Sequence, residues 1–223
     1  GYERAYELVS ALCRDLARKC ISLLKQQRVA MLPYEDFRQL YRQYNEVFEK
    51  LDTLVSRFHD KNYSSKRGDV HKMTARLIMK DTTELRKRLE AFYLKREDHE
   101  RLRRALKQVS AEDSSLVGGT QTIRDLKSAY SEFINEEIFD FTSGSREWAR
   151  VCDSYRKRIE RIETGIARRL QERLSAAKTS EDMFKVFSKF NALFFRNRIR
   201  VAIKQFQEQL VGQVGRDISD LRK

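Results

Sequence analysis

The sequence is poor in residues that interrupt helices and in the patterns that build sheets. Among 223 residues there are one proline and 8 glycines, whereas 35% of the residues are charged. Alternating Val/Ile/Thr stretches bounded by Asn-Gly turns are absent, which argues against β-hairpin folds. The abundant residues are Leu, Arg, Glu, Lys and Ala, which are strong helix formers. We therefore predict an all-α fold.

Motifs that carry chemistry are also absent. No GxxxxGKS/T, GxGxxG, HExxH, GxSxG or CxxC pattern occurs, so the sequence offers no phosphate loop, zinc helix or nucleophile elbow. The carboxylates lie among bases at helical spacing, where ion pairing is their default role. We therefore predict no catalytic residue, no cofactor and no metal site, and hence a segment that is not an enzyme.

The three cysteines form no disulfide framework, which suits a reducing compartment. Cys13 and Cys20 are expected to be small buried apolar groups. No apolar run approaches the ~18 residues of a membrane helix, and no signal-like segment opens the chain. We predict a cytosolic protein without membrane insertion. Because the chain lacks an initial Met and ends on Leu221-Arg222-Lys223 within a helical pattern, we expect a piece of a longer protein.

What the sequence has in abundance is phenylalanine, concentrated between residues 178 and 203. These side chains recur at three- and four-residue steps on a predicted helix that Thr179 caps. A fully buried Phe contributes about 1.5–3 kcal/mol, so such a ridge requires several partner helices. The predicted core residues of this region are Trp148, Phe184, Phe187, Phe190 and Phe194.

The apolar pattern divides the chain into long helices. Pro33 suits the first position of a second helix, and the short connection predicts that the first two helices pack antiparallel. Residues 110–120 contain a Gly-Gly pair and small polar residues, the clearest break in the pattern. The predicted helices cover residues 3–27, 33–58, 69–109, 122–139, 146–177, a phenylalanine helix from 179, and 198–221.

These helices predict elongated antiparallel bundles stacked into a rod, because a helix over 69–109 would be about 60 Å long. We predict a first bundle of three long helices over 1–110, a flexible loop over 111–120, and a second bundle over 121–223 that is truncated at its C-terminal end. His71 and His99 lack partners at metal-binding spacing, and we expect both to be exposed.

The sequence from Trp148 onward resembles the N-terminal tail of cytoplasmic dynein heavy chains. The most specific part is EDMFKVFSKFNALF at 181–194, followed by Arg196, Ile199 and Arg200. Residues 5–24 and 34–37 also resemble that tail, and 62–145 resembles it most weakly. Asn197 stands where we expect proline in the family, and the segment around 110–120 is shorter than expected, as in a divergent, fungal member.

The resemblance implies a non-catalytic segment of a helical stem in a motor for microtubule-based transport. In that family the stem joins two heavy chains and carries the intermediate chain, through its WD-repeat propeller, and the light intermediate chain nearby. The stem also lies along dynactin and cargo adaptors, whereas the ATP-hydrolysing ring and the microtubule-binding stalk lie far downstream. The implied location is cytoplasmic and associated with the microtubule cytoskeleton.

Basic residues on the predicted helix 146–177 and in the turn that follows 195 are the candidates for docking the propeller rim. Two other classes stay open: a basic helical nucleic-acid-binding domain, favoured only by the net charge of +13, and a membrane-tethering helical rod. Acids accompany the bases at helical spacing, which weakens the nucleic-acid alternative. The candidate partner-binding residues are Arg156, Arg161, Arg168, Arg196, Arg198 and Arg200.

Overall fold

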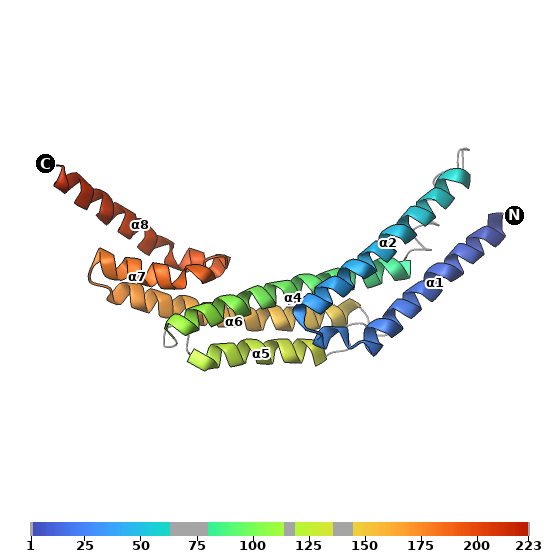
Figure 1. Ribbon diagram of the computed structural model, residues 1–223, viewed down its shortest axis with the longest axis horizontal. Coiled ribbons are helices and arrows are strands. Elements are labelled where there is room, and N and C mark those ends of the chain that lie inside the picture. The colour runs from blue at the N-terminus through green and yellow to red at the C-terminus, as the bar shows by residue number, and fades with distance from the viewer. Residues whose placement is uncertain (1, 63–79, 114–118, 136–144, 223) are drawn as a thin grey trace. The chain divides into compact units, whose positions relative to one another are not determined.

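The computed structural model describes residues 2–62, 80–113, 119–135 and 145–222, and all regular structure in these ranges is helical (Figure 1). The predicted all-α fold is confirmed. By compactness the chain divides into two units. The described part of unit 1 covers residues 2–62 and 80–97, and that of unit 2 covers 98–113, 119–135 and 145–222.

Unit 1 is built on an antiparallel helix pair, as the short connection predicted. Helix α1 (Tyr2–Gln26) leads through the 3₁₀ turn η1 (Val29–Met31) into α2 (Tyr34–Asn62), which runs back beside α1 (Figure 1). Along the seam, Cys13 of α1 packs with Leu51 and Val55 of α2, and all three are buried. Val9 and Leu16 of α1 are partly buried against the same cluster, so this stretch of the seam joins the two helices.

The start of α2 follows from Pro33. Its carbonyl accepts the backbone N–H of Phe37 at 3.0 Å. Pro33 is therefore the residue directly before the helix, whereas the sequence predicted it as the first residue of the helix. The helix α4 (Lys80–Glu112) then supplies its first part to unit 1. Arg96 on α4 donates to the carbonyls of Ala30 at 2.8 Å and Leu32 at 2.6 Å, which satisfies two polar groups of the turn.

Aromatic side chains hold α4 against α2 within unit 1. The Phe37 ring meets the Phe92 ring edge-on at 5.2 Å, and Tyr41 stacks on Tyr93 at 4.1 Å with an interplanar angle of 7°. Such pairs contribute about 0.5–1.5 kcal/mol beyond the area that they bury. Phe37 and Phe92 are fully buried, so they form the centre of this unit's core.

Unit 2 contains the rest of α4 and the helices that follow. Helix α6 is its central element, because it contacts α5, α7 and α8. The Gln171 side chain of α6 also donates to the carbonyl of Ala202 on α8 at 2.8 Å. The elements of unit 2 after α4 are α5 (Gly119–Asn135), α6 (Ser145–Ala176), α7 (Ser180–Phe190), the 3₁₀ turn η2 (Asn191–Leu193) and α8 (Asn197–Leu221).

The compact division differs from the boundary that the sequence suggested at 111–120. It falls inside α4, between Glu97 and Asp98. The apolar pattern of α4 continues across this point, with Leu89 buried in unit 1 and Leu102 in unit 2, so the sequence contains no break there. The stacking of bundles into a rod stays a prediction. The expected helix start at Asp69, the end at Phe139 and the position of His71 lie outside the described residues.

Candidate functional site

The phenylalanine helix begins as predicted. Thr179 has extended backbone, and its side-chain oxygen accepts the backbone N–H of Asp182 at 3.1 Å, which is the contact of an N-cap. Phe187 and Phe190 point into the core and are 9% and 0% exposed. Phe194 is half-buried, and its ring meets Phe187 edge-on at 6.1 Å.

Phe184 departs from the predicted core, because its side chain is 63% exposed. The expectation of a buried ring is wrong at this position. Three residues advance a helix by about 300°, so each three-residue step rotates the side chain by about 60°. The buried direction of α7 lies between Phe187 and Phe190, and Phe184 falls at its edge. Trp148 is also only half-buried, with its ring 6.4 Å from that of Phe133.

Arg196 is part of an internal ion-pair network rather than a free surface cation. It precedes α8 and pairs with Asp98 of α4 and Glu163 of α6, and its side chain is 15% exposed. Burial by itself lowers the pKa of Arg196, but Asp98 and Glu163 outweigh this effect and raise it. The predicted partner-binding role therefore does not suit Arg196, whose charge is already neutralised inside unit 2.

Phe195 lies next to this network. The Arg101 guanidinium carbon is 4.0 Å from the centre of the Phe195 ring, and that of Arg196 is 5.5 Å away. Cations over an aromatic face are attracted by the electron density of the ring. The turn between α7 and α8 is thus fixed to α4 and α6 by both ionic and aromatic contacts.

The remaining candidate arginines have different surroundings. Arg198 is 47% exposed and lies 3.6 Å from Glu160 and 3.7 Å from Glu163. Arg200 is exposed and donates to the side-chain oxygen of Asn197 at 3.1 Å. Arg156 is exposed but pairs with both Asp153 and Glu160, so its charge is largely compensated on its own helix.

One exposed basic row remains on α6, and we call Lys157, Arg161 and Arg168 the α6 row. The three residues recur at steps of four and seven, which places them on one face of the helix. Arg161 makes no ion pair with any residue that the structure describes. Arg168 lies 3.7 Å from Glu172, and both side chains are more than half exposed, so solvent screens this pair. Lys157 lies 2.8 Å from Asp153, so the positive charge that the row offers to a partner comes mainly from Arg161 and Arg168.

A buried polar cluster on α4 was missed by the sequence analysis. His99 is 7% exposed, its Nδ1 lies 3.3 Å from the Tyr155 hydroxyl, and its ring stacks on Tyr130 at 4.3 Å. The expectation that His99 is exposed is wrong, because α5 and α6 cover this side of α4. A signal was available: His99 stands three residues before Leu102, on the same apolar stripe.

Two features were sought among the described residues, a cluster of metal ligands and a membrane-spanning helix. No group of three or more His, Cys, Asp or Glu side chains there could hold a metal ion, and none of its helices is long and apolar enough to span a bilayer. Cys13 and Cys20 are buried as predicted. Burial raises the pKa of both thiols, which disfavours the reactive thiolate.

Comparison with known proteins agrees with the resemblance found in the sequence. The family described as "Dynein heavy chain, N-terminal region 1" matches residues 2–223. Cytoplasmic dynein heavy chains of Fusarium vanettenii and Neurospora crassa are 31% and 30% identical over 99% of this chain and 5% of theirs. The Drosophila melanogaster protein of that name is 29% identical over the same shares.

The chain therefore spans about 5% of the length of these curated relatives. The matched region is the tail of such proteins and not their ATPase motor part. The chain belongs to the dynein heavy chain family and is a segment of its N-terminal region 1.

Proposed function

We propose that this chain is a non-catalytic scaffold in the tail of a cytoplasmic dynein heavy chain, and that the α6 row docks the intermediate chain. The observation that carries the proposal is the exposed positive charge of Arg161 and Arg168 on the central helix of unit 2. An acidic or mixed rim of a WD-repeat propeller would complement this charge.

Helix α6 is suited to docking because its other face is immobilised. Ile166 and Leu170 are fully buried, and Glu163 is held by Arg196. A partner that binds the row therefore meets side chains on a rigid helix, with little backbone to order on binding. Complementary charges of this kind set orientation and association rate more than affinity.

The family membership supports a wider role in assembly. A heavy-chain tail in microtubule-based transport would also meet the light intermediate chain, a second heavy chain, dynactin and cargo adaptors. Its location would be the cytoplasm, at the microtubule cytoskeleton. We propose these partners for the assembled complex, because the whole chain resembles such a tail.

The test reverses two charges of the row. We expect the double variant Arg161→Glu/Arg168→Glu to bind purified intermediate chain about tenfold more weakly, mainly through slower association. The matched control is Arg14→Glu/Arg18→Glu, two exposed arginines of α1 with the same total charge change. Binding kinetics at physiological salt measure both variants, and circular dichroism verifies their folding. Equal affinities of the reversed variant and the parent would refute the docking role of the row.

The nucleic-acid alternative receives less support from the contacts. Arg150 pairs with Glu147, and Lys157 lies 2.8 Å from Asp153, so acids accompany much of the exposed positive charge of α6. Phosphate-driven binding would weaken steeply with added salt. Filter binding to duplex DNA at low and physiological salt tests this alternative, and we expect no retention at physiological salt.

A further inference from the structure

Helix α6 contains a glycine in its middle that the packing of unit 2 does not explain. Gly165 lies within the helix, and an added Cβ there would meet no atom within 4 Å beyond its chain neighbours and the backbone of its own helix. Apart from proline, glycine is the least favourable residue in a helix interior, because it loses the most backbone freedom on folding. No close neighbour in the described part of the chain therefore requires a glycine at this position.

Two arginines of the α6 row stand directly beside Gly165. Arg161 precedes it by four residues and Arg168 follows it by three, and these spacings make side chains neighbours on a helix surface. Within the described ranges Arg161 forms no ion pair, and Arg168 lies 3.7 Å from the solvent-exposed Glu172. The missing side chain thus leaves an open place on α6 with an exposed base on each side, which we call the Gly165 notch.

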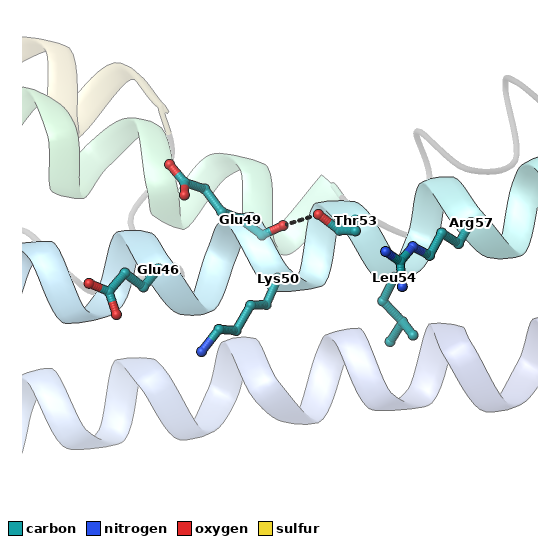
Figure 2. A pocket seen from close by; sticks show the side chains of 6 residues that line it. All are labelled: Glu46, Glu49, Lys50, Thr53, Leu54 and Arg57. Carbon is teal, nitrogen blue, oxygen red and sulfur yellow. Dashed lines mark hydrogen bonds between the residues drawn. The ribbon is translucent and has the colours of Figure 1, made fainter.

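Helix α2 carries the same arrangement of two bases without the notch. Lys50 precedes Leu54 by four residues and Arg57 follows it by three, and the ion pairs of α2 among the described residues involve neither base. Figure 2 shows Lys50 and Leu54 projecting from the same side of α2. These three residues line a groove of about 530 Å³, and a leucine occupies the position that Gly165 leaves open on α6. The other residues that line this groove are Glu46, Glu49 and Thr53.

We infer that the Gly165 notch is the point at which an acidic loop of the intermediate chain packs against α6. Because position 165 has no side chain, the loop backbone reaches the helix backbone there, and one carboxylate on each side pairs with Arg161 and with Arg168. The two arginines are separated by a rise of about 10 Å, which about three extended residues span. The notch names the centre of the contact and rests on the proposed docking by the α6 row.

The surroundings of the notch favour a loop over a second helix. Close packing of two helices needs small residues on successive turns, whereas long arginines occupy the turns before and after Gly165. A narrow backbone segment fits between them. Thr164 beside the notch already donates its hydroxyl hydrogen to the carbonyl of Glu160 at 2.8 Å. The hydrogen-bond donors for the acidic loop therefore come from the two arginines.

The test fills the notch with side chains of increasing length. Gly165→Ala and Gly165→Gln change no charge, and both should melt above the parent because both residues are better helix formers than glycine. Their binding to purified intermediate chain should nevertheless weaken, about threefold for the alanine variant and at least about tenfold for the glutamine variant, mainly through faster dissociation. A variant that is more stable but binds more weakly separates a contact role from a structural one.

Two further variants provide matched controls. An added Cβ at Gly215 of α8 would likewise meet no atom within 4 Å, but the exposed Val211 and Ile218 stand at the two offsets that the arginines occupy on α6. Gly215→Gln should raise the melting temperature and leave intermediate-chain binding unchanged. Lys50→Glu/Arg57→Glu reverses two bases at the same offsets on α2, and this variant should also bind as the parent does.

Salt distinguishes the charged part of the contact from the steric part. The affinity of the parent should fall as salt is added, because the contacts of both arginines are exposed and screened. The ratio of the parental affinity to that of Gly165→Gln should stay constant, because a steric obstacle is not screened. A parental affinity that does not change with salt would overturn the acidic character of the loop.

The remaining outcomes separate the notch from the docking row. A parent that does not bind the intermediate chain, or binds it as tightly after Arg161→Glu/Arg168→Glu, would refute both. A weaker charge-reversed variant together with an unchanged Gly165→Gln variant would refute the notch alone. An alanine effect as large as the glutamine effect would also refute it, because alanine, the stronger helix former, would then act by stiffening α6 and not by filling space.

Discussion

The Arg196 guanidinium forms an ion pair with the Glu163 carboxylate where both side chains are shielded, 15% and 7% exposed respectively. Arg196 stands just before α8, and Glu163 lies in the middle of α6. Asp98 of α4 accepts a second hydrogen bond from Arg196. One side chain therefore fixes the end of the phenylalanine turn to two other helices of unit 2.

This arrangement predicts a large stability loss when either buried partner is removed. Arg196→Ala and Glu163→Ala should each lower the free energy of unfolding by about 1.5–3 kcal/mol, because a shielded charge loses its best hydrogen-bonded partner. A more exposed partner remains in each case, Arg198 beside Glu163 and Asp98 beside Arg196. The double variant should lose less than the sum of the two. Urea denaturation measures all three, with the exposed Arg200→Ala as control. A loss below about 0.5 kcal/mol for Arg196→Ala would show that the network contributes little.

The phenylalanines of α7 predict a graded response to truncation. Phe190→Ala and Phe187→Ala should each cost about 3–5 kcal/mol, because their rings are buried and leave cavities. Phe184→Ala provides a matched control on the same helix, with a ring 63% exposed, and should change stability by about 0.5 kcal/mol or less. Thermal and urea unfolding measure how much stability each of the three variants loses. A cost at Phe184 equal to that at Phe190 would contradict the exposed orientation.

Helix α7 shows which features could be predicted from the sequence and which could not. The cap at Thr179 and the burial of Phe187 and Phe190 follow from local rules, namely a short polar side chain before a helix and an apolar period near 3.6. Which end of the ridge is buried depends on the neighbouring helices, so local rules place Phe184 wrongly. The turn into η2 at Asn191 likewise has no strong local signal, because Asn-Ala-Leu suits a helix nearly as well.

The ion-pair network shows what local rules cannot supply. Arg196 is 33 residues from Glu163 and 98 from Asp98 in the sequence, and nothing near Arg196 distinguishes it from Arg198 or Arg200. The sequence predicts all three as exposed bases at the entrance of a helix. Only the packing of α4 and α6 beside the turn makes the first of them internal and leaves the third exposed.

The start of α8 predicts that Asn197→Pro stabilises the chain. Asn197 is the first residue of the helix. Arg196 before it has extended backbone, with φ −81° and ψ 116°, and this conformation is compatible with a proline at the next position. The first helical N–H needs no intrahelical acceptor. The free energy of unfolding should therefore rise by about 0.4–1 kcal/mol through a less flexible unfolded chain.

Val201→Pro is the control for this substitution. Val201 lies inside α8 and is 64% exposed, so proline there breaks a helical hydrogen bond without removing core packing and should cost about 3 kcal/mol or more. Thermal melts of the two variants should move in opposite directions. A lower melting temperature for Asn197→Pro would mean that the hydrogen bond from Arg200 to the Asn197 side chain outweighs the gain in rigidity.

Glu100 predicts a defined dependence of stability on pH. Hydrogen bonds from Arg103, supported by Arg104, lower the pKa of the Glu100 carboxyl, although its burial opposes this. The native state therefore keeps Glu100 ionised at a pH where the unfolded chain already binds the proton. Its contribution is complete above the ordinary Glu pKa of about 4.3 and is lost as pH falls through the lowered native value.

Glu100→Gln should accordingly destabilise the chain by about 1.5 kcal/mol at neutral pH, because the hydrogen bonds to a charged acceptor weaken. The difference from the parent should shrink as the pH falls below the ordinary Glu pKa of about 4.3 and through the lowered native pKa, because the parental carboxyl then itself becomes protonated. Glu172→Gln, whose carboxylate is 66% exposed, should show no such trend in urea denaturation across the same range. A gap that stays constant with pH would mean that Glu100 stabilises unit 2 by its shape and packing, since neither changes when the carboxyl binds a proton.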